Sequence, residues 1–471
     1  MLFNSFEFLV FFIAVILVSL LLREKGEWRV FFLFIASCYF YMCWNWKFLF
    51  LILFSICLDY TVGWRIYISE SITVRKRWLA VSLTGNIGCL AVFKYYNFFA
   101  ENIASFFSGI GLTLPLPHWN IILPVGISFY TFQTLSYTFD IYRGELRPKK
   151  NFLHFATYVA FFPQLVAGPI VRARDFLPQL EKVWRFSDKE AMSGAAQIIQ
   201  GLFKKVLIGD ALAAALVDQA YSYPGSFSGV TLLLATYGYA MQIYCDFSGY
   251  SDIAIGCARV LGFRLPVNFN RPYMATSVTD FWRRWHISLS TWLRDYLYIS
   301  MGGNRKGRVR TYINLMVTML LGGLWHGAAW NFVLWGGAHG FFLVAERFLG
   351  RWINLKKVGN SHMAILARRL LTFHIVLLGW VLFRAKDLQT VKVVLWRIIT
   401  FAEGLDGVGV HFLLPLLVGY FLHLSPLSLK DLISKRFVEA NGFLQGALIS
   451  LFIFAVMLIM GDNAPFIYFQ F

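Results

Sequence analysis

The chain consists of long apolar stretches separated by short polar segments. Many stretches approach the roughly 20 residues that an α-helix needs to span a bilayer. The candidate membrane segments are 5–22, 29–46, 48–63, 78–98, 120–141, 152–170, 193–218, 228–258, 312–348, 364–384, 389–402, 410–425 and 443–460. Several are too short to cross alone, and 312–348 is long enough to bend or to cross twice. The pattern predicts an all-α, polytopic membrane protein with about eleven transmembrane helices and additional re-entrant or interfacial helices.

Composition supports this class. Of the 471 residues, 58% are hydrophobic and 14% charged, whereas roughly a quarter of a soluble domain is charged. Because apolar stretches recur along the whole length, we expect a single membrane domain over 1–471. The first run, 8–22, has neither a basic start nor a small-residue cleavage site, so we expect a retained helix rather than a signal peptide. No internal repeat is visible, which disfavours the repeat-built transporters.

The charge is strongly basic, with 43 Lys and Arg against 25 Asp and Glu and a net charge of +18. Nucleic-acid binding is one explanation for such an excess, but no basic run is interleaved with a nucleic-acid motif. Short cytoplasmic loops of membrane proteins also collect Lys and Arg. We therefore expect no nucleic-acid partner and place the basic segments 75–77, 143–150, 304–310 and 430–436 on the cytoplasmic face.

The segment 259–311 is rich in both arginine and aromatic residues. Within it, Phe281–Leu297 is compatible with one amphipathic helix whose start Thr279 and Asp280 could cap. At 3.6 residues per turn, one face would carry Trp282, Trp285, His286, Leu289 and Leu293. We expect this helix at the membrane surface or dipping into a protein-lined cavity.

Several candidate membrane segments contain charged side chains, among them Lys204, Lys205, Asp246 and Asp252. For Lys204 and Lys205 we expect an interfacial position, because their long stems can snorkel to the membrane surface. For Asp246 and Asp252 we expect a buried polar framework, with catalysis as the alternative. The six cysteines show no C-x-x-C pair and no metal-ligand spacing, which favours core packing over disulfides.

Two of the nine histidines stand out as candidates for chemistry. His326 lies in Gly-Gly-Leu-Trp-His-Gly at 322–327, where glycines allow close approach of another backbone or a long ligand. An imidazole there can exchange a proton near neutral pH; the alternative is a histidine hydrogen-bonded in the helix core. His286 lies in the amphipathic segment. His339, thirteen residues after His326, need not share its face and is a secondary candidate.

The other six histidines lack polar neighbours in the sequence, so we expect them to be interfacial or packed. They are His118, His154, His362, His374, His411 and His423. Zinc needs three or four closely spaced ligands, so we expect no metal. Serine-hydrolase and phosphate-loop motifs are also absent from the sequence.

A buried histidine, a second histidine and a basic, aromatic entrance together suit acyl transfer from a thioester to an alcohol. The base removes the hydroxyl proton as the oxygen attacks, and a donor must hold the developing oxyanion. Basic residues at a cytoplasmic mouth would suit a phosphate-bearing donor such as coenzyme A. We expect no permanently bound cofactor and acetyl-CoA as the acyl donor.

The chain resembles the membrane-bound O-acyltransferase superfamily, and within it the branch of the alginate O-acetyltransferase membrane subunit and related bacterial polysaccharide O-acetyltransferases. The stretches that carry the resemblance are 94–97, 123–133, 166–170, 246–252, 269–273, 280–299, 322–327, 379–385 and 466–471. The resemblance implies many helices around a thin centre pierced by a tunnel. It also implies a multi-pass protein of the bacterial inner membrane that works with a periplasmic or extracellular acetyltransferase partner on a polysaccharide acceptor.

The family's membrane histidine corresponds to His326, and the histidine of its Trp-His-x-Ser-Leu-Ser motif to His286. We expect His326 to act as general base or to form a transient acyl-imidazole, and His286 to orient a substrate or stabilise charge. Candidate tunnel residues that would contact the acyl donor are Trp285, Ser288, Ser290, Arg294, Asp295 and Trp325. The acceptor stays open among alginate, peptidoglycan, cellulose and teichoic acid, and the alternative from another class is a non-catalytic acyl or glycan transporter.

Overall fold

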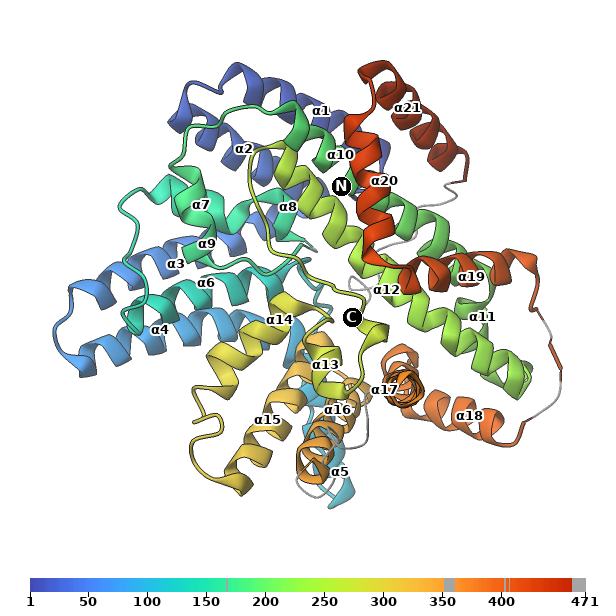
Figure 1. The fold of residues 1–471 in the computed structure, drawn as a ribbon. Coiled ribbons are helices and arrows are strands. Elements are labelled where there is room, and N and C mark those ends of the chain that lie inside the picture. The colour runs from blue at the N-terminus through green and yellow to red at the C-terminus, as the bar shows by residue number, and fades with distance from the viewer. Residues whose placement is uncertain (167, 351–360, 402–403, 406, 460–471) are drawn as a thin grey trace. The chain divides into compact units, whose positions relative to one another are not determined.

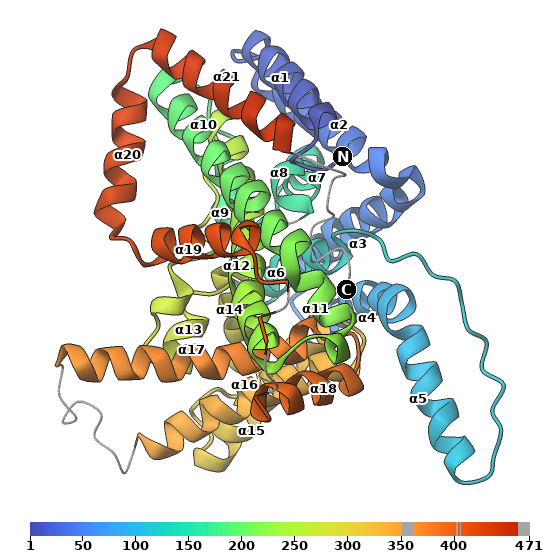
Figure 2. The same ribbon diagram turned by 90° about the vertical axis from the view of Figure 1, so that its right-hand side faces the viewer.

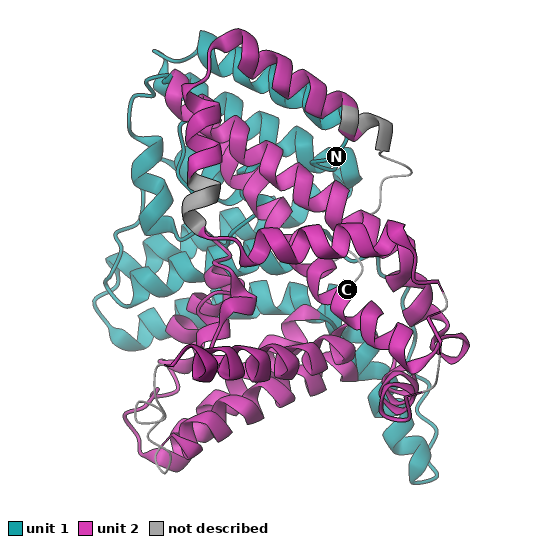
Figure 3. Cartoon of the chain, turned by 45° about the vertical axis from the view of Figure 1, so that its right-hand side comes forward, with its two compact units in different colours: residues 1–187, 261–265, 327–329 teal, residues 188–260, 266–326, 330–471 magenta. Residues whose placement is uncertain are grey.

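The computed structural model describes residues 1–166, 168–350, 361–401, 404–405 and 407–459, and these residues form helices and loops without a strand (Figure 1). The all-α prediction is confirmed for this part of the chain. The motif at 466–471 and residue 167 of the motif at 166–170 lie outside the described residues. The chain divides into two compact units (Figure 3): unit 1 holds 1–187, 261–265 and 327–329, and unit 2 holds 188–260, 266–326 and 330–471.

Unit 1 contains the N-terminal helices. They are α1 (Phe6–Leu21), α2 (Gly26–Asn45), the 3-10 turn η1 (Trp46–Phe48), α3 (Leu49–Ile68), α4 (Ile72–Leu90), the π-helical η2 (Ala91–Tyr95), α5 (Tyr96–Gly109), α6 (Ile127–Tyr142), α7 (Phe152–Ala160), α8 (Phe162–Leu165) and α9 (Ala173–Leu180). Its core includes a buried carboxylate, Asp59 on α3, which accepts hydrogen bonds from Ser82, from Asn86 at 2.8 Å and from Thr138 at 3.1 Å. The buried carboxyl group is tolerable there because α4 and α6 supply its hydrogen-bond partners.

Unit 2 contains the remaining helices. They are α10 (Asp188–Leu202), the π-helical η3 (Phe203–Asp210) and η4 (Ala213–Val217), α11 (Asp218–Ser222), η5 (Pro224–Ser226), α12 (Gly229–Val260), η6 (Pro272–Met274), α13 (Val278–Trp282), α14 (Ile287–Trp292), the π-helical η7 (Leu293–Tyr298), α15 (Arg308–His326), α16 (Trp330–Leu349), α17 (His362–Arg384), α18 (Leu388–Ile399), α19 (Val410–Leu424), α20 (Leu427–Glu439) and α21 (Gly442–Ile459).

Glycines at heptad spacing bring α10 and α12 together. A Cβ added at Gly194 would lie 2.8 Å from the backbone oxygen of Gly256, and one at Gly201 would lie 2.5 Å from that of Gly249. Backbone atoms cannot yield as a flexible side chain can, so only glycine fits at this crossing. This contact fixes the long helix α12, from which Asp246 and Asp252 project.

Two helical stretches among the described residues are long and apolar enough to cross a membrane: 26–68, which covers α2, η1 and α3, and α17. Shorter apolar helices are 6–21, 410–424 and 442–454. The number of crossings therefore stays a prediction. The stretch 312–348 is two helices, α15 and α16, as its length suggested.

The lysines of η3 do not snorkel as expected. Lys205 is buried, and its Nζ lies 2.5 Å from Asp246 and 2.7 Å from Asp210, while Lys204 Nζ lies 2.5 Å from Asp252. Interfacial exposure was the wrong prediction because three carboxylates face these amines within unit 2. The buried polar framework expected for Asp246 and Asp252 is confirmed.

The cysteines are only partly packed as expected. Cys38, Cys245 and Cys257 are buried, whereas Cys43 and Cys57 are exposed; all six are free thiols. The exposed pair lies on α2 and α3, which also expose large apolar side chains, and there a cysteine behaves as a small hydrophobic residue.

Candidate active site

His326 is the last residue of α15, and close packing of α15 against α16 fixes its position. A Cβ added at Gly323 would lie 2.2 Å from the backbone oxygen of Phe332, and one at Gly336 would lie 2.2 Å from that of Met319. α16 in turn contacts α17, as Figure 2 shows. The glycines before His326 therefore allow another backbone to approach, as the sequence predicted.

Three aromatic rings enclose the His326 imidazole, which is buried. Its ring centroid lies 5.0 Å from Trp325, 5.0 Å from Trp335 of α16 and 5.2 Å from Phe383 of α17. Each contact is edge-to-face, a preferred geometry for aromatic pairs. The ring thus lies in a buried aromatic environment contributed by three helices.

The segment before His286 is not one continuous helix, contrary to the sequence prediction for Phe281–Leu297. α13 ends at Trp282, α14 begins only at Ile287, and the π-helical η7 follows. The N-cap is Ser277, whose Oγ accepts the N–H of Asp280 at 3.1 Å, rather than Thr279 or Asp280. The expected common face is accordingly split: Trp282 contacts Trp335, whereas His286 contacts Phe247.

The break is explained by hydrogen bonds to a neighbouring extended segment. The N–H of Ile287 donates to the backbone oxygen of Asn268 at 2.9 Å, and the N–H of Asn270 donates to that of Arg284 at 2.9 Å. His286 has φ 42° and ψ 56°, in the left-handed region. A non-glycine residue there is strained by roughly 1–3 kcal/mol, and such strain clusters at functional sites.

Asn268 fixes the His286 ring and was missed by sequence reasoning. Its Oδ1 lies 3.2 Å from His286 Nδ1 and also accepts the N–H and Oγ–H of Ser288, at 3.2 and 2.9 Å. Its Nδ2 donates to Ser251 Oγ at 3.1 Å, which sets the orientation of the amide. Because Oδ1 is an acceptor, His286 Nδ1 carries the proton and Nε2 carries the lone pair. The only signal in the sequence was its place just before the 269–273 motif.

The two predicted catalytic histidines contact the same tryptophan. Trp325 is 6.0 Å from His286 and 5.0 Å from His326, measured between ring centroids. Both imidazoles are buried, with exposed fractions of 0% and 4%. The prediction that these residues belong to one site thus agrees with the geometry, although their catalytic roles stay predictions.

The other candidate residues divide into two groups. Trp285 is buried against Trp380, at 4.9 Å between ring centroids, and Ser290 Oγ donates to the Trp285 backbone oxygen at 3.1 Å. Ser288 and Trp325 contact the His286 ring. Arg294, in contrast, is exposed, and its Nε lies 2.6 Å from the carboxylate of the adjacent residue Asp295. The structure therefore does not bring Arg294 to the histidines.

His339 lies nearer this site than its spacing suggested. The spacing assumed one helix, but the chain breaks after His326, and both histidines contact Trp335, at 5.0 and 4.9 Å between ring centroids. His339 is fully buried. His339 was predicted to be a secondary candidate because one continuous helix was assumed, and that helix is broken after His326.

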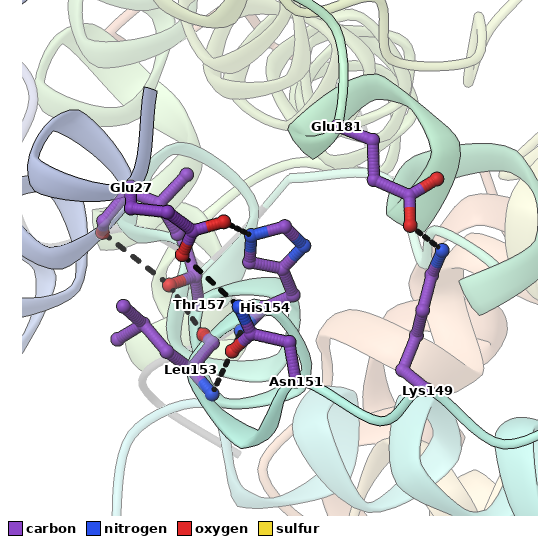
Figure 4. Close-up of polar contacts among 8 residues, drawn as sticks. Glu27, Lys149, Asn151, Leu153, His154, Thr157 and Glu181 are labelled. Atoms are coloured by element: carbon purple, nitrogen blue, oxygen red, sulfur yellow. Dashed lines mark hydrogen bonds and ion pairs between the residues drawn. The ribbon is translucent and has the colours of Figure 1, made fainter. Parts of the chain in front are cut away.

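Four of the six remaining histidines have polar partners that the sequence did not reveal. In Figure 4 the Nε2 of His154 lies 3.0 Å from Glu27, and Asn151 contacts the same carboxylate at 3.0 Å. The figure also shows the Lys149–Glu181 ion pair of unit 1. The other pairs are His118–Glu101, His374–Tyr237 and His423 with the Tyr273 N–H. His362 and His411 are exposed.

A buried pair of imidazoles, one with a fixed lone pair, can take a proton from a hydroxyl and stabilise charge on an attacked carbonyl. Together with the strand-free fold of the described residues and the strongly apolar sequence, this arrangement is that of a membrane enzyme of the acyl-transfer class.

Comparison with known proteins agrees with this class. Residues 29–383 match the model of MBOAT, the membrane-bound O-acyltransferase family. The chain belongs to the membrane-bound O-acyltransferase family, and it is an O-acyltransferase and a membrane protein.

Among its relatives, the probable alginate O-acetylase AlgI of Pseudomonas aeruginosa is 43% identical over 84% of this chain and 74% of the relative. The peptidoglycan O-acetyltransferase of Helicobacter pylori is 36% identical over 80% of this chain and 74% of the relative. The teichoic acid D-alanyltransferase of Bacillus subtilis is 31% identical over 58% of this chain and 73% of the relative.

Proposed function

We propose that this O-acyltransferase takes an acetyl group from acetyl-CoA in the cytoplasm and passes it across the bacterial inner membrane for O-acetylation of an exported polysaccharide such as alginate. The similarity to the alginate O-acetylase supports the acetyl group and the acceptor. The apolar stretches support a multi-pass protein, and a periplasmic or extracellular acetyltransferase would complete transfer to the sugar.

The observation that carries the proposal is the pairing of His286 and His326 around Trp325. His326 accepts the proton of the hydroxyl whose oxygen bonds to the acyl carbon. The carbon–sulfur bond of the thioester then breaks, and the imidazolium returns the proton to the departing thiolate. His286, held by Asn268, orients a substrate through its Nε2. No metal or redox partner is consumed in this sequence.

Two relatives support alternative acceptors, namely peptidoglycan and teichoic acid. Peptidoglycan and teichoic acid are named for proteins 36% and 31% identical to this chain. The higher identity to the alginate O-acetylase, 43%, favours an alginate-like acceptor.

The direct test supplies the purified protein with radiolabelled acetyl-CoA, the partner acetyltransferase and the polysaccharide acceptor, and it measures released CoA and label on the protein or the polymer. The wild type should release CoA, and His326→Gln should not. The control is His374→Gln, since His374 is exposed and bonds to Tyr237 instead of the site. Equal CoA release by wild type and His326→Gln would overturn the proposal, and binding without turnover in all three would favour a carrier.

A further inference from the structure

Three rings beside His326 form a closed triangle that the reaction as described does not use. Trp335 and His339 of α16 lie 4.9 Å apart, and Trp282 of α13 lies 5.7 and 5.3 Å from them, measured between ring centroids. Trp335 and His339 are each 1% exposed. Three polar aromatic rings in mutual contact at this depth are unusual for apolar packing, because every one of them carries a nitrogen that needs a partner.

None of these nitrogens has a hydrogen-bond partner among the described residues. The unpaired atoms are Nε1 of Trp282, Nε1 of Trp335, and both ring nitrogens of His339. A neutral imidazole has one N–H and one lone pair, so the triangle offers three donors and one acceptor. Leaving a buried N–H unpaired is costly, and such groups in native structures point to a bound polar atom or to catalysis.

Two of the donors face the same place on α17. The position that a Cβ would take at Gly379 is 2.8 Å from His339 Nε2 and 3.4 Å from Trp335 Nε1. Any other residue there would collide with the imidazole. Glycine therefore allows the α17 backbone to pass close to both nitrogens without a side chain between them.

The triangle adjoins the proposed base through a shared ring. Trp335 contacts both His326, at 5.0 Å, and His339, at 4.9 Å between ring centroids. The Trp335 and His339 N–H groups carry no formal charge and are surrounded by aromatic side chains. Such donors suit an uncharged oxygen that becomes negative during the reaction, rather than a phosphate or carboxylate that is already charged. The carbonyl oxygen of a thioester attacked beside His326 has this chemistry.

We propose that Trp335 and His339 form the oxyanion site of the acyl transfer, donating N–H groups to the thioester carbonyl oxygen as it becomes negative. This rests on the proposed function, because the oxygen belongs to the acetyl donor. When the hydroxyl oxygen bonds to the acyl carbon, the electron pair of the C=O double bond moves onto the carbonyl oxygen. It returns as the carbon–sulfur bond breaks, and neither donor loses its proton. Trp282 closes the triangle and excludes water.

The test compares Trp335→Phe, which keeps a ring and removes one N–H, with His339→Leu and His339→Gln. Removing one oxyanion donor typically lowers kcat about 100-fold or more. We expect that loss for Trp335→Phe and His339→Leu at an unchanged KM for acetyl-CoA. Because its amide still donates, His339→Gln should recover part of the loss. A ketone analogue of acetyl-CoA, with CH₂ in place of sulfur, should bind the folded variants as tightly as the wild type.

The possible outcomes are separable. If wild type releases CoA and Trp335→Phe matches its kcat, the oxyanion site is overturned while acyl transfer stands. A raised KM with unchanged kcat, or equal losses in His339→Leu and His339→Gln, would assign a packing role and also overturn it. If wild-type protein releases no CoA, the acetyl-CoA donor and this inference both fall.

Discussion

The Oδ1 atom of Asn268 lies 3.2 Å from Nδ1 of His286 and holds that imidazole in one tautomer. The same oxygen accepts two hydrogen bonds from Ser288, so the amide is fixed on both sides. His286 sits at a break between two helices with a left-handed backbone. Its position thus depends on a residue eighteen positions earlier rather than on its own helix.

Replacing this amide should impair catalysis more than folding. We expect Asn268→Ala to lower kcat about 100-fold, because a misoriented group near the reacting atoms costs on this order. The kcat of each variant is measured from steady-state CoA release. The matched control is Asn270→Ala, two residues later with an exposed side chain, which should keep wild-type turnover. Full activity in Asn268→Ala would show that His286 needs no such support.

Neighbouring glycines before His326 should respond very differently to the same substitution. Gly323→Ala places a methyl group 2.2 Å from the Phe332 backbone oxygen, whereas Gly322→Ala meets only Leu293 Cδ1 at 3.3 Å. We expect Gly323→Ala to destabilise the protein by about 1–3 kcal/mol or more through overpacking, and Gly322→Ala to be nearly neutral. Thermal unfolding in detergent compares them, and equal midpoints would contradict the close α15–α16 crossing.

The buried lysine should be a structural element rather than a catalytic one. Lys205→Met leaves Asp246 and Asp210 without their cation, and breaking a buried pair costs about 3–5 kcal/mol. Adding Asp246→Asn should recover part of the loss. For the control, Lys435→Met removes an exposed pair with Glu439 and should cost below about 1 kcal/mol. If Lys205→Met unfolds like the wild type, the amine does not stabilise unit 2.

The start of α18 provides a pH-dependent prediction outside the membrane segments. Asp387 accepts the Thr390 N–H at 2.7 Å, and this backbone hydrogen bond lowers the pKa of the carboxyl below its ordinary value. Because the pKa is lower in the folded state, the ionised carboxylate stabilises the helix at pH values above the pKa of the unfolded state. This stabilisation is lost as the pH falls through the folded-state pKa.

We therefore expect Asp387→Ala to increase hydrogen exchange in the first turn of α18 at neutral pH, by about 1 kcal/mol in opening free energy. The difference between variant and wild type should shrink in acid. A difference that persists unchanged below the folded pKa would contradict the cap.

Apolar stretches and motif residues predicted the all-α class and the pair His286 and His326. They did so because membrane helices need length and hydrophobicity, and because an imidazole between glycines has few structural uses in an apolar helix. The break before His286 was not predictable from helical periodicity, since it depends on hydrogen bonds to 268–270.

The same limit explains the other differences. The break after His326 turns His339 toward the same tryptophan, and a continuous helical wheel cannot represent that contact. Lys205 was expected at the interface because its sequence neighbours are apolar, while its partner Asp246 is supplied by α12, 41 residues further along the chain. Contacts of this kind are set by tertiary packing and not by local pattern.

The central claim, that His326 performs the acyl transfer, is tested most directly in cells that export the acetylated polysaccharide. His326→Ala should insert and accumulate as the wild type does, verified by immunoblot of membranes, and the polymer should contain no O-acetyl esters by NMR. Normal acetylation of the polymer in that variant would contradict the claim.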